Sequence, residues 1–437
     1  MAHVPRCDDD SRESFSLGVG GRESDCWSDA DTLVCHPILL GNLRFPQLVS
    51  RFAFTDDADR SVCTTLLYHA MRILLINQFI PPATPPTARL VGDLAETLRG
   101  AGHEVVCIGA TSGYGPVRGV RRIWRDLTAH LKISMAVLAA GRCDWIVCLS
   151  DPTGLPFTAS ILARLKGARM AHWAMDVYPQ VAVALQALKN GVATRAVGAA
   201  MRYGYQGCDL LVGLDGDMAK EIAHVSGCPV SVLPPWPPAI EDSETIDPIE
   251  AGQKSRRRWL YSGNLGRAHD FTTLLEAQRQ IEAEGLPWEL HFQGGGPCRQ
   301  AAISMAEEMG LKHCHWSGYA PDDELLSSLL GADVLIATQL PETRGLLWPS
   351  KLALMQQLDL PILWIGPTEG QIAQDLERAR TLAGVFANGD ANAVVTWLKS
   401  LPPAAPRTNP AVVQTRVAKL RAAGMAQWCA WLTPIGG

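Results

Sequence analysis

The sequence predicts an α/β protein built from two doubly wound parallel sheets in tandem. Short apolar runs rich in β-branched residues alternate with amphipathic runs of helical period, and this alternation occurs in two separate series. Strands that alternate with helices of about 10 to 15 residues are typical of parallel β-α-β units. A proline-rich stretch beginning "VLPPWPPAI" interrupts the alternation once, so the chain divides into two halves of similar size.

The first 70 residues are polar, are rich in Ser, Asp and Gly, and show no sustained strand or helix period. We therefore expect residues 1–70 to lack a fold. Two explanations stay open. Either Met71 is the true start of translation and the preceding segment is a mis-annotated extension, or the segment is a regulatory tail.

The first predicted domain covers residues 71–240. Its first strand is the apolar run "RILLINQF", of the kind that is buried on both faces of a parallel sheet. A helix over 87–100 follows, and the glycines at its end favour a left-handed cap. The later strands are "EVVCIGA", "DWIVCLS", "ARMAHWAMD" and "CDLLVGLD", with helical segments between them.

The second predicted domain covers residues 258–405, after a linker at 241–257. Its strands are "RWLYSG", "WELHFQGG", "CHWSGY", "DVLIATQL", "LPILWIG" and "AGVFA", and a helix is expected from residue 350. Residues 406–437 are expected to form one or two helices whose Trp and Leu face needs a packing partner. Ligands of such sheets bind at the carboxyl ends of the strands, so we expect the two domains to face each other across a ligand-binding cleft.

Composition excludes several classes of function. The formal net charge of −5 gives no basic excess for binding a nucleic-acid backbone. None of the 12 cysteines forms a C-x-x-C pair and most lie in apolar runs, which is typical of buried thiols in a reducing cytoplasm. No apolar run approaches the roughly 18 residues of a membrane-spanning helix, and no signal peptide is evident. We expect a cytoplasmic protein that is soluble or at most attached to a membrane face.

The stretch "GVRRIWRDLTAHLKISMAVL" is a candidate for contact with a membrane. It places four cations beside Trp124 and several aliphatic residues, namely Arg121, Arg122, Arg125 and Lys132. A basic amphipathic helix of this kind can lie on an anionic membrane surface. A core helix with a solvated basic edge has the same pattern, and both interpretations stay open.

A glycine-rich loop follows the first strand of the second domain. In "SGNLGRAHD", Gly263 and Gly266 let backbone N–H groups approach an anion, with Asn264 between them, and Arg267 can supply a bidentate guanidinium. Judged alone, this loop is equally well explained as an ordinary turn between a strand and a helix.

Two further loops have the same character. In "QGGGP", Gly294 and Gly295 permit close approach of a ring or a phosphate, although a tight turn also explains them. In "LLWPSK", Pro349, Ser350 and Lys351 are expected in the first turn of a helix, where free N–H groups, a hydroxyl and an ammonium would hold an anion. The alternative is a serine cap and a solvated lysine.

The order and spacing of these loops resemble those of the retaining glycosyltransferases of family 4, which have the glycosyltransferase-B fold. The likeness is strongest to the subgroup that builds bacterial surface polysaccharides such as colanic acid, exopolysaccharide and O-antigen. It extends over nearly the whole chain from Met71 and rests on "YSGNLG", "FQGGGP", "WSGYAPDDE", "WPSKL" and "LPILWIGP", with "WAMDVYPQ" and "VLPPWPP" in the first half.

The resemblance implies a donor site for a UDP- or GDP-sugar in the second domain, with no bound cofactor or metal. Lys351 and Arg267 would offset the charge that builds on the leaving nucleoside diphosphate. Retention implies front-face attack through an oxocarbenium-like transition state. The acceptor, lipid-linked or an oligosaccharide, would meet Asp176 and Tyr178 in the first domain. His172 is expected to be a packed core histidine.

The sequence departs from the family at several positions. Many members carry two glutamates that contact the donor, and the corresponding positions here are Leu346 and Leu354. Of the acidic residues nearby, Glu369 is expected to reach the ligand in preference to Glu342. The glutamate of the "D-L-W-P-E" segment is Gln180. Two alternatives to a transferase therefore stay open: a non-catalytic homologue that binds partners or glycan, and a nucleotide-sugar 2-epimerase of the same fold.

Overall fold

The computed structural model describes residues 70–83, 85–110, 120–240, 256–379, 382–403 and 408–433. The prediction for residues 1–70 lies outside these ranges except at residue 70, and the prediction for the 241–257 linker lies outside them except at its last two residues. The described residues from Met71 onward belong to a single compact unit.

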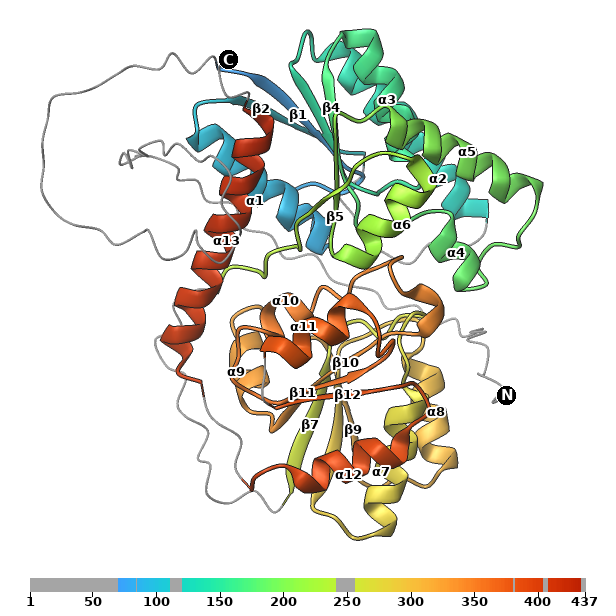
Figure 1. The fold of residues 1–437 in the computed structure, drawn as a ribbon, viewed down its shortest axis with the longest axis vertical. Coiled ribbons are helices and arrows are strands. Elements are labelled where there is room, and N and C mark those ends of the chain that lie inside the picture. Colours follow the sequence, from blue (N-terminus) through green and yellow to red (C-terminus); the bar gives the residue numbers. More distant parts are fainter. Residues whose placement is uncertain are drawn as a thin grey trace, which may run out of the picture. The chain divides into compact units, whose positions relative to one another are not determined.

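The first half forms a six-stranded sheet in the order β2-β1-β3-β4-β5-β6, in which all pairings are parallel (Figure 1). Its strands are β1 (Arg72–Ile76), β2 (Glu104–Ile108), β3 (Trp145–Cys148), β4 (Arg169–Trp173), β5 (Leu210–Gly213) and β6 (Ser231–Val232). Its helices are α1 (Pro86–Gly100), α2 (Val120–Ala139), α3 (Leu155–Lys166), α4 (Gln180–Ala184), α5 (Val192–Gln206) and α6 (Gly216–Ser226).

The second half forms another six-stranded parallel sheet, in the order β12-β11-β10-β7-β8-β9. Its strands are β7 (Arg257–Ser262), β8 (Trp288–Gln293), β9 (Cys314–Ser317), β10 (Val334–Thr338), β11 (Ile362–Ile365) and β12 (Ala383–Phe386). Its helices are α7 (Thr272–Ala283), α8 (Arg299–Glu308), α9 (Leu325–Leu330), α10 (Leu352–Met355), α11 (Gln371–Ala379) and α12 (Ala391–Ser400), with a short 3-10 turn η3 (Pro341–Thr343). The predicted α/β class with two parallel sheets is confirmed.

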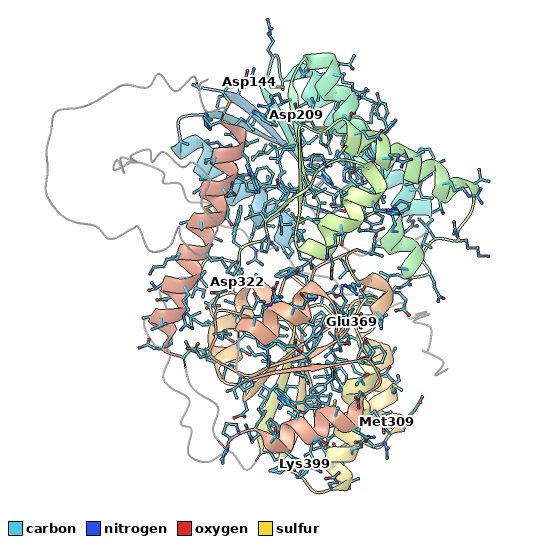
Figure 2. The ribbon with its side chains drawn as sticks, in the orientation of Figure 1. Asp144, Asp209, Met309, Asp322, Glu369 and Lys399 are labelled. Atoms are coloured by element: carbon cyan, nitrogen blue, oxygen red, sulfur yellow. The ribbon has the colours of Figure 1, made fainter. Side chains whose placement is uncertain are left out.

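Helices cover both faces of each sheet, so the strands are apolar on both sides as their sequences predict. In the first sheet, α1 and α6 pack on one face, and α2 and α3 on the other. In the second sheet, α7, α8 and α12 cover one face, and α9, α10 and α11 the other. Aspartates satisfy backbone N–H groups at the amino ends of the first sheet, where Asp144 accepts from Arg72 N and Asp209 accepts from Met170 N (Figure 2).

The closing segment is a single helix, α13 (Pro410–Leu432). The sequence predicted either one or two helices here. Its amino-terminal part packs Val413 and Val417 into the core of the second half. Its carboxyl-terminal part packs Trp428 and Leu432 into the core of the first half, beside α1 (Figure 1). The Trp and Leu face thus finds its packing partner in the first half, while the two valines pack in the second.

No helix among the described residues is both long enough and apolar enough to cross a membrane. The cysteines in the same residues form no disulfide bond. His172 is fully buried, with its Nδ1 3.1 Å from the carbonyl oxygen of Cys148, and burial lowers the pKa of this histidine to about 4. It is the packed core residue that the sequence predicts.

Candidate functional site

The two glycine loops of the second half lie side by side at the carboxyl ends of β7 and β8. Gly263 N donates to the Gln293 carbonyl (2.8 Å), and Leu265 N donates to the Gly295 carbonyl (2.7 Å). A Cβ atom on Gly294 would lie 2.2 Å from the Gly263 carbonyl oxygen, and the φ of Gly294 is +131°. Only glycine fits here, so this residue type is needed for the contact between the loops.

Lys351 reaches the first of these loops from the segment after β10. A Cβ atom on Gly263 would lie 3.6 Å from Lys351 Nζ, and Nζ stands 3.3 Å from the ring centroid of Tyr261. Part of the lysine stem is exposed, but Nζ is buried and has no hydrogen-bond partner in the described part of the chain. Burial holds the pKa of Lys351 well below its usual range. A buried amino group without a partner in the described structure therefore lies beside the loop.

The helix expected from residue 350 is shorter than predicted. The regular helix α10 spans only Leu352–Met355, and Lys351 is the residue that precedes its first turn. Pro349 and Ser350 form the turn that leads into it, with their carbonyl oxygens accepting from Leu352 N and Ala353 N. The helix thus begins two residues later than expected and is one turn long. The anion-binding role of Pro349, Ser350 and Lys351 stays a prediction.

The other residues predicted for the donor site differ in their exposure. Asn264, Arg267 and Ser350 are exposed, and Gly266 is partly buried. The Arg267 side chain makes no hydrogen bond or ion pair with the residues that the structure describes. Pro349 is buried. Arg267 is thus free to contact a ligand, whereas the proline supports the turn.

Asp176 contacts the lysine-bearing segment through the main chain. It forms an antiparallel bridge with Leu347, and Val177 N donates to the Leu346 carbonyl (2.8 Å). Ser150 Oγ accepts from Asp176 N at 3.3 Å. Burial, with the negative charge of Asp151, raises the pKa of Asp176 to about 7. The structure thus pairs this candidate from the first half with the segment that carries the lysine.

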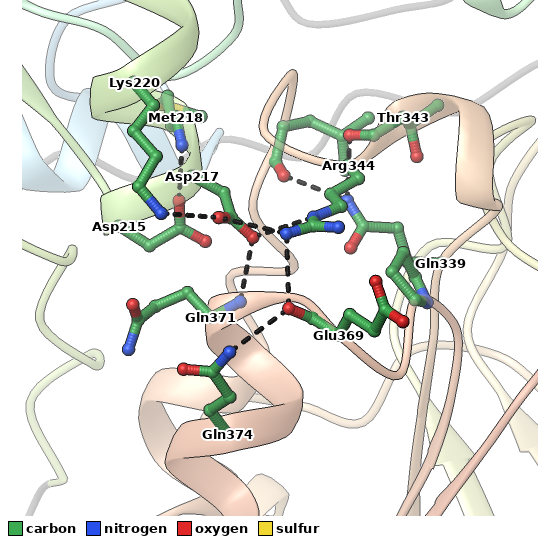
Figure 3. A network of polar contacts seen from close by, with 12 residues as sticks. Asp215, Asp217, Met218, Lys220, Gln339, Thr343, Arg344, Glu369, Gln371 and Gln374 are labelled. Atoms are coloured by element: carbon green, nitrogen blue, oxygen red, sulfur yellow. Dashed lines mark hydrogen bonds and ion pairs between the residues drawn. The ribbon is translucent and has the colours of Figure 1, made fainter.

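A polar network joins α6 to the same segment (Figure 3). The Asp217 carboxylate accepts from Arg344 Nε (3.0 Å) and from Gln371 N (2.8 Å). Burial opposes its charge, but these hydrogen bonds hold the pKa of Asp217 below its usual value. Glu369 is exposed, and its backbone carbonyl, rather than its carboxylate, accepts from Arg344 (3.2 Å) and Gln374 (3.2 Å). The sequence did not predict the link between Asp217 and Arg344.

Three aromatic or imidazole side chains near the loops were also missed. Tyr261 donates through its hydroxyl to the Asn264 carbonyl (2.9 Å) and places its ring under Lys351. His269 Nδ1 lies 2.7 Å from the Thr338 carbonyl, and burial together with the Lys351 charge lowers the pKa of His269 to about 3.

Tyr319 is exposed beside the second glycine loop, where a Cβ atom on Gly295 would lie 3.0 Å from its ring. Tyr261 lies near the end of one predicted strand, and Tyr319 is the last residue of another. Both also stand in the segments "YSGNLG" and "WSGYAPDDE", and these are the sequence signals that could have identified them.

The positions of the family's two glutamates lie inside the fold, because Leu346 and Leu354 are both buried. A cavity of about 800 Å³ lies beside Trp348 and is also lined by Asp215, Gln371 and Arg378. None of the site residues predicted from the sequence lines this cavity, so we do not assign the donor to it.

One family model matches part of the sequence. Residues 242–347 match the family model of glycosyl transferases group 1. The matched segment contains both glycine loops and ends before Lys351. No curated protein matches the sequence at a significant level.

Solved structures with the same fold include a sucrose-phosphate synthase from Thermosynechococcus elongatus (TM-score 0.56, 15% identity, covering 83% of this chain and 96% of that one). HepE from Anabaena in complex with UDP matches with a TM-score of 0.55 and 12% identity, covering 83% of this chain and 99% of that one. WaaG, a glycosyltransferase involved in lipopolysaccharide biosynthesis, matches with a TM-score of 0.54 and 16% identity, covering 83% of this chain and 100% of that one. These similarities show the GT-B fold, and the domain match on that fold supports a glycosyltransferase enzyme.

Proposed function

We propose that the protein transfers a sugar from a UDP- or GDP-sugar to an acceptor, with retention at the anomeric carbon, as in family 4. In this proposal residues 258–405 are the donor domain and residues 71–240 the acceptor domain. Residues 241–257 link them, and residues 406–437 close the fold. The acceptor is a lipid-linked or oligosaccharide intermediate of bacterial surface polysaccharide synthesis, met at the inner face of the cytoplasmic membrane.

One observation carries the donor site: Lys351 Nζ is buried without a hydrogen-bond partner beside Gly263. A buried ammonium that lacks a partner is costly, and an anion at this place would remove the cost. The diphosphate of a nucleotide supplies that anion, and the adjoining glycine loop gives it room. HepE, one of the structures with this fold, is in complex with UDP.

Other residues have roles that follow from where they lie. Arg267, exposed and free, would contact the diphosphate from the solvent side. Tyr319 offers an exposed ring beside Gly295, where a nucleobase could stack. Asp176 would face the acceptor, since its main chain pairs with the lysine-bearing segment.

The chemical step follows from these roles. As the bond between the sugar and the diphosphate breaks, negative charge grows on the leaving phosphate, and Lys351 and Arg267 stabilise it. The acceptor hydroxyl attacks the same face of the oxocarbenium-like sugar. Its proton passes to the departing phosphate, so the reaction requires no strong protein base.

Membrane contact rests on a stripe of exposed apolar side chains along α2. Because successive residues turn by about 100°, side chains three or four positions apart share one face of a helix. The stripe comprises Ile123, Trp124, Leu127, Leu131, Met135 and Leu138, which are between 53% and 65% exposed. The inward face of the helix is formed instead by Ala129, Ile133 and Val137.

Arg121 and Lys132 are exposed beside the stripe. Apolar side chains flanked by cations fit the surface of a bilayer that contains anionic lipid. We therefore propose that α2 lies on the inner face of the cytoplasmic membrane, where a lipid-linked acceptor would be found.

The donor proposal is tested by titrating the full chain with UDP, GDP and their sugars. Release of UDP or GDP from the sugar nucleotides is measured in parallel. We expect binding of one nucleotide series, weakened at least about tenfold by Lys351→Ala and by Arg267→Ala. A folded protein that binds no nucleotide would overturn the proposal and favour the non-catalytic homologue. Recovery of a C2 epimer of the donor sugar would favour the epimerase.

The membrane proposal is tested by sedimentation with vesicles of phosphatidylcholine, with and without about 30% phosphatidylglycerol. We expect binding that increases with the anionic lipid and is lost in Leu131→Asp. Val412→Asp, at an exposed apolar position on α13, is the matched control and should bind like the wild type. No binding to either vesicle, or self-association of the wild type that Leu131→Asp abolishes, would argue that a protein covers the stripe.

A further inference from the structure

Two histidines and a glutamate lie together on β8 and β9, apart from the glycine loops. Glu289 and His291 are two residues apart in β8, so their side chains lie on the same face of the sheet. His315 of β9 is the register partner of His291. The Glu289 carboxylate oxygens lie 2.8 Å from His291 Nε2 and 3.5 Å from His315 Nε2, and the two imidazole centroids are 4.5 Å apart.

We propose that these three side chains form a binding site for a divalent ion of the zinc type. Bonds of about 2.0–2.2 Å at tetrahedral angles separate neighbouring ligand atoms by about 3.3–3.6 Å. One candidate ligand atom from each residue lies within 4.8 Å of the others, so small side-chain rotations produce this geometry. Three protein ligands leave the fourth position for water.

The donor set selects the kind of ion. Two imidazoles with one carboxylate suit Zn²⁺, Ni²⁺ or Cu²⁺, whereas Mg²⁺ and Ca²⁺ require mostly oxygen ligands. The site is also reachable, because β9 is the edge strand of its sheet and the side chain of His315 is 45% exposed.

Arg258 is the residue that opposes an ion at this place. It stands in register with Glu289 on the neighbouring strand β7 and interacts with the carboxylate charge. Its guanidinium partly balances that carboxylate when no ion is bound. A divalent ion must add its charge beside this cation, which limits the affinity but leaves the three ligands in place.

The position of the cluster gives the ion a structural effect. β8 continues from His291 to the second glycine loop, and three residues of strand place Gly294 about 10 Å away. Gly294 N in turn donates to the Ser317 carbonyl at the end of β9 (3.0 Å). An ion would clamp the two strands just below this loop. The inference stands on the three side chains and does not depend on the proposed transferase activity.

The test is calorimetric titration of the full chain, freed of metal, with Zn²⁺. We expect about one equivalent to bind, with at least a tenfold loss of affinity in His291→Ala and in His315→Ala. His313→Ala is the matched control, because His313 lies two residues from His315 but outside the cluster. Its affinity should stay within about twofold of the wild type. Circular dichroism establishes that each variant is folded.

Absorption of the Co²⁺-substituted protein provides a second readout, since three protein ligands and water should give intense visible bands that His315→Ala loses. Absence of Zn²⁺ binding by the wild type would overturn the proposal. So would binding that survives the loss of both cluster histidines, or an equal loss in His313→Ala, because either result would assign the ion to other side chains.

Discussion

Replacement of Lys351 by methionine should make the free protein more stable and its nucleotide binding weaker. Burial lowers the pKa of Lys351, and its Nζ has no hydrogen-bond partner in the described part of the chain. A buried donor that is left unpaired costs about 1–3 kcal/mol. Methionine has a side chain of similar length without this donor, so we expect a stabilisation of about 1–3 kcal/mol.

The same substitution removes a charged hydrogen bond to the diphosphate, worth about 1.5–3 kcal/mol. Nucleotide affinity should therefore fall by about 10- to 150-fold. Because burial lowers the pKa of Lys351 in the folded state, the unfolded state binds more protons between the two pKa values. The stability of the wild type should rise with pH over that interval, and the advantage of the variant should vanish as pH approaches about 10.4.

Urea unfolding between pH 6 and 10, with and without UDP or GDP, measures both effects. Lys312→Met, at an exposed lysine of the same half, is the control and should change neither quantity. A Lys351→Met protein that is destabilised at pH 7 and binds nucleotide like the wild type would refute the reasoning. The lysine would then be an ordinary packing residue.

Three further substitutions probe the site. Gly294→Ala should cost at least about 2 kcal/mol of stability, because its Cβ would meet the Gly263 carbonyl in a backbone region that disfavours alanine; urea unfolding measures the loss. Asp217→Asn should cost about 1–3 kcal/mol at pH 7 by weakening its bonds to Arg344 and to the backbone of residue 371. The difference should shrink as pH falls below the ordinary aspartate pKa of about 4, and it should vanish once pH passes the lower pKa of the folded carboxylate. Asp176→Asn should be more stable than the wild type at pH 8 but not at pH 5. The raised pKa of Asp176, about 7, makes the wild type lose stability as pH rises from about 4 through 7. Thermal unfolding across this pH range measures how stability changes with pH.

Matched variants separate these effects from general damage. Gly318→Ala introduces a methyl group into open space near the same sheet edge and should be neutral, so an equal loss in both glycine variants would contradict the clash. Asp322→Asn changes an exposed carboxylate (Figure 2) and should give a difference below about 0.5 kcal/mol at every pH. A pH-independent difference in Asp217→Asn or Asp176→Asn would reject the assigned carboxylate titration.

The elements that the sequence predicted correctly are those specified by local patterns. Runs such as "RILLI" and "VLIAT" are apolar on both faces, which is possible only for strands covered on both sides. The glycine loops were also recognisable in the sequence. Glycine admits positive φ, and glycines directly follow the predicted strands at these two places.

The features that escaped prediction depend on contacts between distant segments. The segment "LALMQQL" has helix-forming residues throughout, yet α10 ends at Met355. Beyond it, Leu358 is buried, and Asp359 N donates to Thr408 Oγ1, 49 residues away. The bond between Asp217 and Arg344 spans 127 residues, so neither neighbourhood contains a signal for it.

The helix α13 has a consequence for how the chain is made. The indole of Trp145 in β3 donates to the Leu432 carbonyl, 287 residues later, and Trp428 packs against Trp173 in β4. A ribosome that adds about 5–20 residues per second needs about 15–60 s to make the intervening chain. During that interval the nascent first sheet displays an uncovered apolar surface, so its last core residues arrive only after the second sheet has been synthesised.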